Sequence, residues 1–228
     1  MHKGQELDEK IQQNIQVADQ QDRAYNMALN YLSHQLRTVY EVSDYLQQHE
    51  ITDDTITVII KRLLAQHYLD DQNYADSFVR TMYRTSDNGP YLIKQKLKKK
   101  HVDEIIIEQA LQQFSETQQV KNAIANINKL AKHYQRDAYK IKQQKIYQAL
   151  LKKGYNSDII NQALTAVDLP NDTDEQYQLL VQHGQKLLSR YHTLTLTNRH
   201  QKIIQTLYRK GFNIDDIYRF LDENDNEN

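Results

Sequence analysis

The side chains of this 228-residue chain that could do acid–base chemistry include carboxylates that occur in adjacent pairs. Four such pairs stand at the start of an expected helix: Asp53-Asp54, Asp70-Asp71, Asp103-Glu104 and Asp215-Asp216. Acids at that position cap a helix and complement its dipole. We therefore interpret the pairs as structural rather than catalytic.

Metal and nucleophile chemistry has no support in the residue spacing. The chain has 9 histidines and no cysteine, which excludes disulfides, cysteine nucleophiles, iron–sulfur clusters and Cys-ligated zinc. No His-x-x-His or His-Glu-x-x-His spacing places two histidines on one helical face, and P-loop, Gly-x-Gly-x-x-Gly and Gly-x-Ser-x-Gly motifs are absent. We predict a protein that is not an enzyme and that uses no cofactor and no metal.

Lysine and arginine are informative because they are unevenly distributed. The formal net charge is −1 at pH 7, so affinity for an anionic partner must come from segregated charge. Three helical segments at equivalent places along the chain carry the positive charge: Lys94, Lys96, Lys98, Lys99 and Lys100; Lys140, Lys142, Lys145, Lys152 and Lys153; and Arg199, Lys202, Arg209 and Lys210. A basic strip of this kind suits a phosphate backbone or an acidic protein groove. The alternative is a solvated surface without a partner.

The elements that must position these residues are helices. Apolar residues recur at i, i+3, i+4 and i+7, as in Ile56, Ile59, Ile60 and Leu63, which makes one apolar stripe on an α-helix. The chain has only 5 Gly and 2 Pro, too few turn residues for an all-β fold. It contains no signal peptide and no apolar run of about 18 residues. We predict an all-α, cytoplasmic protein with no membrane partner.

One helix–turn–helix pattern occurs four times. Its anchor leucines, Leu46, Leu97, Leu150 and Leu207, are 51, 53 and 57 residues apart. Five residues after them stand Ile51, Val102, Tyr155 and Phe212, and ten residues after them stand Ile56, Ile107, Ile160 and Ile217. Another helix precedes each pair, so we expect a polar leader at 1–21 and three-helix repeats at 22–70, 71–115, 116–170 and 171–228, the last with an acidic tail. Repeats this small share apolar faces with their neighbours, which predicts an elongated, curved, solenoid-like array.

The first two repeats contain a specific set of residues: Tyr68, Leu69, Asp70, Asp71, Tyr74, Ala75, Phe78, Val79 and Arg80, then Gly89, Pro90, Ile93, Leu97 and Lys100 downstream, and Ala28, Leu29, Tyr31, Leu32, Arg37, Thr38 and Glu41 upstream. In these residues the first two repeats resemble the RecX family. We interpret most of them as structural: Leu69, Tyr74, Phe78 and Val79 as core between the first two repeats, Asp71 as a helix N-cap, and Gly89 and Pro90 as a loop. The resemblance continues more weakly through the third and fourth repeats.

The resemblance implies a regulator of the RecA recombinase, built of tandem three-helix repeats. It implies binding in the groove of the RecA–DNA filament, inhibition of ATP hydrolysis and strand exchange or disassembly of the filament, and a role in homologous recombination, DNA repair and the SOS response. Some members also bind DNA directly, so single- and double-stranded DNA are candidate partners. Arg37, Arg80 and Arg84 join the lysines as contact candidates. The polar ends of the array are compatible with a monomer.

Two departures from the family pattern, the nature of the N-terminal residues and two other interpretations stay open. His34 and Gln35 stand where members often have a basic pair, and Glu50 and His101 stand where a glycine commonly ends the second helix. Residues 3–7 resemble the end of a small β-rich segment that precedes the first repeat in Gram-positive members, which would make this chain a truncation. One alternative is a helical array that binds DNA or RNA without a recombinase. The other is an adaptor whose lysines only solubilise it.

Overall fold

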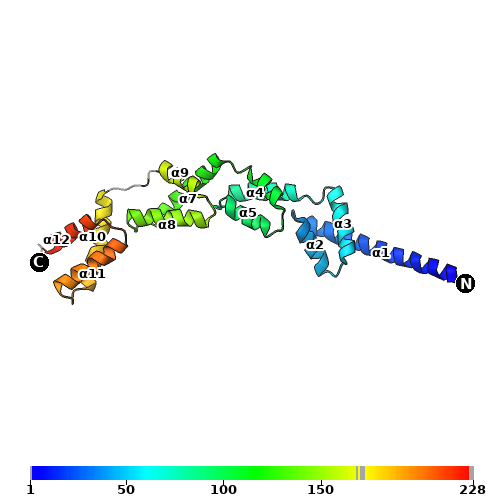
Figure 1. The fold of residues 1–228 in the computed structure, drawn as a ribbon, viewed down its shortest axis with the longest axis horizontal. Coiled ribbons are helices and arrows are strands. Elements are labelled where there is room, and N and C mark those ends of the chain that lie inside the picture. The colour runs from blue at the N-terminus through cyan, green and yellow to red at the C-terminus, as the bar shows by residue number, and fades with distance from the viewer. Residues whose placement is uncertain (1, 168, 170–172, 226–228) are drawn as a thin grey trace. The chain divides into compact units, whose positions relative to one another are not determined.

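The structure is a computed structural model that describes residues 2–167, 169 and 173–225. The helices of these residues, most of them labelled in Figure 1, fall into two compact units, Met1–Ser115 and Glu116–Asn228. The described residues form twelve helices and no strand, so the predicted all-α class and the tandem three-helix repeats are confirmed. The curved shape of the array stays a prediction. None of the described helices is long and apolar enough to cross a membrane.

The first repeat uses the C-terminal part of a long helix. It comprises α1 (His2–Leu32), α2 (Val39–Gln48) and α3 (Asp53–Ala65), next to the N-terminus in Figure 1. The apolar stripes of the three helices meet in one core, where Ala28, Leu46 and Leu63 are fully buried. Residues 2–21, expected as a leader, continue α1 without interruption, and residues 3–7 are therefore helical.

The second repeat has a core of its own. It comprises α4 (Asp71–Thr85), α5 (Pro90–Lys98) and α6 (Glu104–Leu111). Tyr74 and Val79 are buried in this core, with Phe78 packed against it, whereas Leu69 belongs to the core of the first repeat. The expectation that these residues form one core between the two repeats is therefore wrong. Each repeat buries its own stripes.

The second unit repeats the same plan twice. The third repeat comprises α7 (Glu116–His133), α8 (Tyr139–Lys152) and α9 (Ser157–Ala166), and the fourth comprises α10 (Thr173–Arg190), α11 (Leu196–Arg209) and α12 (Ile214–Asp225). Leu150 lies fully buried in the core of the third repeat, and Leu207 and Phe220 lie fully buried in the core of the fourth. The acidic residues at the end of the chain lie partly in α12 and partly outside the described residues.

The turn after the second helix has the same geometry in all four repeats. One residue there has a positive φ: Glu50 at 62°, His101 at 56°, Gly154 at 87° and Gly211 at 87°. The N–H of the next residue donates to the carbonyl of the anchor leucine four times, from Ile51, Val102, Tyr155 and Phe212, at 3.2–3.3 Å. This bond and the apolar contact beside it form a Schellman C-cap. Without a glycine, Glu50 and His101 hold the left-handed conformation at a cost of about 1 kcal/mol each.

Candidate protein and nucleic-acid interface

A basic pair closes the second helix of three repeats, immediately before the left-handed residue. The pairs are Lys99-Lys100, Lys152-Lys153 and Arg209-Lys210, and the first repeat has Gln48-His49 at the same place. Cations at a helix C-terminus are stabilised by the helix dipole. The dipole explains why cations stand at this place, but it does not neutralise them, so they can still bind an anionic partner. Because the turn geometry repeats, two adjacent cations occupy the same place at the end of the second helix in three repeats.

Six of the predicted contact residues on the second helices are exposed cations without a carboxylate partner among the residues that the structure describes. They are Lys96, Lys99, Lys140, Lys152, Arg209 and Lys210. On α4, Arg80 and Arg84 are exposed in the same way. Lys202 is exposed as well, but its Nζ atom lies 5.6 Å from the ring centroid of Tyr191. Such unpaired surface cations remain available to an anionic partner.

Other predicted lysines are engaged inside their own repeat. Lys94 pairs with Glu104 and, at 3.3 Å, with Glu108, and Lys98 pairs with Glu104 at 2.7 Å. The hydrogen bond from Lys94 lowers the pKa of Glu104, and the bond to Glu104 raises the pKa of Lys94. Helix α6 therefore compensates part of the charge of α5. These two glutamates could not be identified as partners from the sequence because they belong to a different helix.

In the second unit, four further candidates are poorly placed for an outside partner. Lys142 is only 8% exposed, and Lys145 pairs with Asp137 at 2.8 Å. Lys153 is half-buried and already has a partner. Arg199 is half-buried, and its Nε atom is buried without a hydrogen bond.

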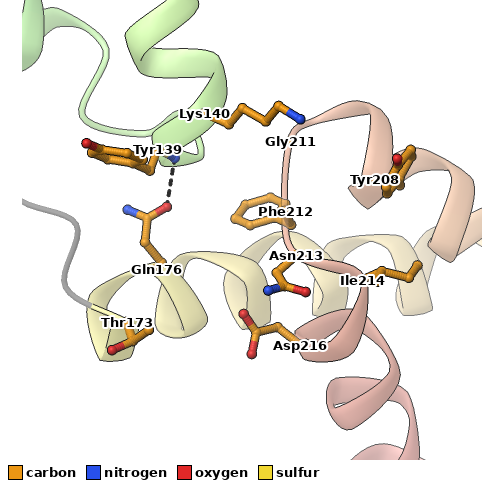
Figure 2. A pocket seen from close by; sticks show the side chains of 10 residues that line it. All are labelled: Tyr139, Lys140, Thr173, Gln176, Tyr208, Gly211, Phe212, Asn213, Ile214 and Asp216. Carbon is orange, nitrogen blue, oxygen red and sulfur yellow. Dashed lines mark hydrogen bonds between the residues drawn. The ribbon is translucent and has the colours of Figure 1, made fainter.

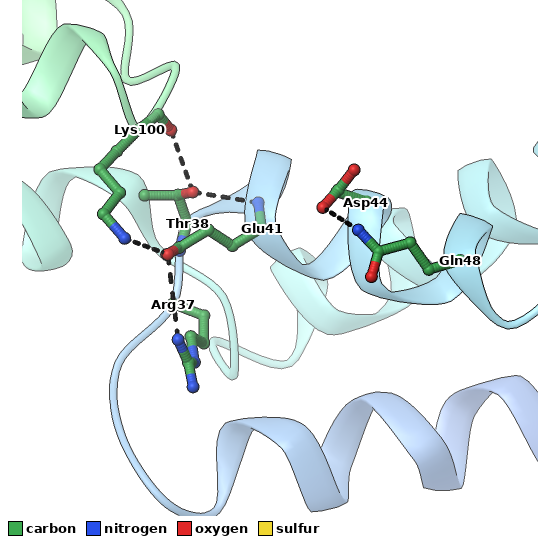
Figure 3. A network of polar contacts seen from close by, with 6 residues as sticks. All are labelled: Arg37, Thr38, Glu41, Asp44, Gln48 and Lys100. Atoms are coloured by element: carbon green, nitrogen blue, oxygen red, sulfur yellow. Dashed lines mark hydrogen bonds and ion pairs between the residues drawn. The ribbon is translucent and has the colours of Figure 1, made fainter.

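Arg37 and Lys100 belong to a junction between the first two repeats, shown in Figure 3. The Thr38 hydroxyl donates to the Lys100 carbonyl at 3.1 Å, and the Lys100 ammonium pairs with the Glu41 carboxylate. Thr38 and Glu41 also form a capping box at the start of α2. The guanidinium of Arg37 lies 3.9 Å from Glu41 and 4.2 Å from the ring centroid of Tyr31.

Asp71 completes this junction from the second repeat. The Val39 N–H, at the first position of α2, donates to Asp71 Oδ1 at 2.9 Å. The N-cap of α4 is Asp70, whose carboxylate accepts from the Asn73 N–H, so the expectation that Asp71 is the cap was wrong. Within an Asp-Asp pair the cap is ambiguous by one residue, and here the second carboxylate satisfies a helix of the preceding repeat.

The two junction carboxylates respond to burial in opposite ways. Burial alone would raise the pKa of Glu41, but the hydrogen bonds from Lys100 and the Thr38 N–H and the charges of Lys100 and Arg37 lower it below its ordinary 4.5. Burial raises the pKa of Asp71 above its ordinary 3.8, because the single Val39 bond does not compensate for the lost solvation. Glu41 is therefore the stabilising anion of the junction.

Replacing this anion tests the junction. We expect Glu41→Gln to lower the free energy of unfolding by about 1–3 kcal/mol at pH 7, because Lys100 loses its charged partner. Folding lowers the pKa of Glu41, so its contribution is present above the ordinary 4.5 and disappears as the pH falls through the lower folded value. Urea denaturation at pH 7 and at about pH 3 should therefore show the two proteins converging in acid. Asp19→Asn, at an exposed position of α1, serves as control, and a difference that persists in acid would contradict the assignment.

The junction between the third and fourth repeats has the same construction. The Tyr139 N–H, at the first position of α8, donates to Gln176 Oε1 of α10 at 2.8 Å (Figure 2). Ile141 packs on the turn of the fourth repeat, where a Cβ on Gly211 would lie 2.5 Å from Ile141 Cγ1. In both junctions the start of a second helix contacts the first helix and the turn of the next repeat. Neighbouring repeats within a unit are therefore locked by backbone-directed contacts.

The surface offers binding features rather than a catalytic centre. A cavity of about 380 Å³ lies at the second junction and is lined by Tyr139, Lys140, Gln176, Tyr208 and Phe212 among others (Figure 2). Its lining holds no pair of groups in nucleophile–base contact. No group of three or more His, Cys, Asp or Glu residues that could hold a metal occurs in the described part of the chain.

Comparisons with known proteins identify relatives of the whole chain. Models of the RecX three-helix domains match residues 24–63 (first domain), 70–111 (second domain) and, for the third domain, both 116–164 and 174–221. The chain is 46% identical over 219 residues to a regulatory protein RecX of Levilactobacillus brevis, and the match covers 96% of this chain and 82% of the relative. It is 36% identical over 221 residues to the Bacillus cytotoxicus protein of that name, with 97% and 82% covered.

Two solved structures resemble the fold. The crystal structure of RecX from Lactobacillus salivarius matches with a TM-score of 0.65 and 46% identity, covering 67% of this chain and 99% of that one. A second crystal structure of a regulatory protein RecX matches with a TM-score of 0.66 and 35% identity, covering 69% of this chain and 77% of the other.

Proposed function

Because this chain belongs to the RecX family of regulatory proteins, we propose that it binds the filament of a RecA recombinase on DNA and inhibits its ATP hydrolysis and strand exchange. The observation that carries the proposal is the recurrence of exposed cations on the second helices of three repeats. A row of cations on a repeat protein matches a partner that is itself periodic and anionic. DNA and acidic recombinase surfaces in the filament have these properties.

The proposed mechanism is occupancy rather than chemistry. A protein bound along the filament groove obstructs the movements that couple ATP turnover to strand exchange, without a catalytic residue of its own. The contacts we propose are the exposed cations Lys96, Lys99, Lys140 and Lys152 of the second helices, together with the exposed Arg80 and Arg84 of α4. Arg37 and Lys100 hold two repeats together, so they act on binding through the fold. We also propose that the protein works in the cytoplasm as a monomer.

The test is single-strand-DNA-dependent ATP hydrolysis by the cognate RecA, measured while this protein is titrated. We expect inhibition at well below one molecule per recombinase, together with weaker direct binding to the same DNA at equal salt. No inhibition, combined with tight DNA binding that weakens steeply with salt, would instead favour a nucleic-acid-binding array that acts without a recombinase. Absence of both effects would favour an adaptor with solubilising lysines.

A further inference from the structure

The two junctions differ in one residue that decides their charge. Glu41 is the third residue of α2, and Ile141 is the third residue of α8. Lys100 and Lys210 each stand three residues after their anchor leucine, in the turn that faces these positions. In the first junction the carboxylate of Glu41 satisfies Lys100. In the second junction an apolar side chain stands at that place, so Lys210 has no corresponding anion.

A basic pocket lies at this place in the second junction. It has a volume of about 230 Å³. Its polar lining is Arg136, Asp137, Lys145, His183, Arg209 and Lys210, and its apolar wall is Ala138, Ile141 and Phe212. The single carboxylate, Asp137, is already bound to Lys145 at 2.8 Å. Arg136, Arg209 and Lys210 form no ion pair with any residue that the structure describes.

We propose that this pocket binds a phosphate group of a nucleic-acid backbone. This inference deepens the proposed function, on which it rests, by naming where the second unit contacts DNA. The pocket is smaller than the roughly 300–1,000 Å³ of ordinary ligand sites, but its 230 Å³ accommodate one phosphate group with its ester linkages. Guanidinium groups such as those of Arg136 and Arg209 bind two oxygens of a tetrahedral oxyanion at once. The anion takes the role that Glu41 has in the first junction.

The surroundings favour a nucleic-acid phosphate over a free one. The larger cavity of Figure 2 shares Phe212 with the basic pocket and begins at the next residues of the same turn. It is bordered by Lys140 and by the ring of Tyr208, which is 62% exposed. A nucleotide whose phosphate occupies the basic pocket thus finds an aromatic ring for its base and a further cation close by.

His183 provides an internal reporter of occupancy. Burial lowers the pKa of His183 below 6.5, and the charges of Lys210 and Lys186 lower it further, against the opposing effects of the Arg136 carbonyl and Asp137. The remaining charged groups of the pocket, the guanidinium of Arg136, Lys145 of α8 and Arg209 of α11, are cations. A bound anion favours the charged imidazolium. Filling the pocket should therefore raise the pKa of His183.

The decisive variant transfers the anion of the first junction to the second. We expect Ile141→Glu to weaken binding of a fluorescent oligo-dT strand to the full chain by about tenfold, because the introduced carboxylate neutralises the pocket. The slope of log affinity against log salt should fall by about 0.7, the value for one phosphate of a single strand. Ile141→Gln has nearly the same shape without the charge, and it should stay within about twofold of the parent protein. Equal affinities of the two variants would overturn the proposal.

A second pair of variants separates the pocket from general charge. Arg209→Ala with Lys210→Ala should weaken oligo-dT binding about tenfold, whereas Lys121→Ala with Lys132→Ala, at exposed positions of α7 outside the pocket, should not. Equal losses would reject the site.

Titration of inorganic phosphate, followed by NMR of His183, distinguishes the source of the anion. We expect phosphate to raise the pKa of His183 in the parent protein and in Ile141→Gln, and not in Ile141→Glu. Suppose that phosphate raises the pKa of His183 in this way but that Ile141→Glu binds oligo-dT as tightly as the parent protein. The pocket would then bind free phosphate, and the nucleic-acid assignment would be overturned. Loss of filament inhibition without loss of oligo-dT binding would mean an acidic partner protein and would also overturn it. If the site is correct and the regulator proposal fails, Ile141→Glu still weakens DNA binding while the parent leaves ATP hydrolysis unchanged.

Discussion

Gly184→Leu is expected to unfold the fourth repeat and to leave the first unit folded. A Cβ on Gly184, in the middle of α10, would lie 2.4 Å from two ring carbons of Phe220, which is fully buried in the core of that repeat. Because the ring is fully buried, we expect even alanine to overpack the core, at a cost of about 1–3 kcal/mol. Leucine adds three more carbons, and we expect it to lower the free energy of unfolding by about 3 kcal/mol or more.

Glycine is an unfavourable helix residue, which makes its presence here informative. In a helix interior it is about 1 kcal/mol worse than alanine, so the close approach of the Phe220 ring accounts for a residue that the helix itself disfavours. In a repeat array, stability is transmitted mainly between neighbours. The damage should therefore reach the third repeat through the junction at Tyr139 and Gln176 and decline with distance along the chain.

Hydrogen exchange measured by mass spectrometry is the appropriate readout of Gly184→Leu. Peptides from α10 to α12 should lose protection, while peptides from α1 to α6 should keep theirs. Gln185→Leu places the same side chain at the adjacent, exposed position of α10 and should change stability by less than about 0.5 kcal/mol. Phe220→Ala in the Gly184→Leu background should restore part of the protection. Equal protection in the two leucine variants would show that the core of this repeat tolerates the added volume.

The fold could be predicted because its determinants are local and repeated. The four anchor leucines, Leu46, Leu97, Leu150 and Leu207, are all fully buried. The isoleucines ten residues later, at Ile56, Ile107, Ile160 and Ile217, are between 0% and 7% exposed. The apolar stripe of a helix and the cap that ends the helix are both determined by residues close together in the sequence. Four copies of the same pattern reinforce the inference.

The electrostatic partners of the lysines could not be predicted because they come from other helices. Nothing in the spacing of Lys94 and Lys98 reveals that Glu104 of α6 faces them, and nothing near Lys100 in sequence reveals Glu41. Tertiary contacts of this kind depend on how helices pack, which a single sequence does not specify. The spacing Thr38-x-x-Glu41 is typical of a capping box, but it does not reveal that Glu41 is also the anion of a junction.

One error was avoidable from the sequence itself. Lys142 stands four and eight residues before Ile146 and Leu150, so it lies on the buried stripe of α8, and it is only 8% exposed. A lysine there packs its aliphatic stem against the core. Lys140, two residues earlier, turns about 160° away on the same helix and is exposed. Helical phase therefore separates contact candidates from core residues within one basic segment.

Reversing four of the six exposed, unpaired cations of the second helices should abolish filament inhibition under the proposed function. The set is Lys96→Glu, Lys99→Glu, Lys140→Glu and Lys152→Glu. We expect the concentration of this protein needed to inhibit ATP hydrolysis to rise about 100-fold or more at about 0.1 M salt. The reason is that four side chains that attract the anionic filament would repel it instead. Charges that face a partner interact over less than the Debye length of about 10 Å, so salt screens the repulsion between them only in part.

A matched set of reversals decides whether position or total charge is responsible. The control set, with the same change in net charge, is Lys61→Glu, Lys121→Glu, Lys132→Glu and Arg190→Glu. All four are exposed on first or third helices. Lys132 and Arg190 lie in the last turns of α7 and α10, as Lys96 and Lys152 of the first set lie in the last turns of α5 and α8. Both sets therefore pay a similar helix-dipole penalty, about 0.3–1 kcal/mol for each reversal in a last turn.

The comparison of the two sets carries the argument for a directed surface. If only total charge matters, both sets lose inhibition equally, because long-range steering depends on the field of the whole protein. If the second helices face the filament, the control set should inhibit within about threefold of the parent protein while the first set fails. Lys94, Lys98 and Lys100 are unchanged in both sets, so their internal ion pairs keep the first unit folded. A loss in the first set alone therefore reports on the exposed face of α5 and α8.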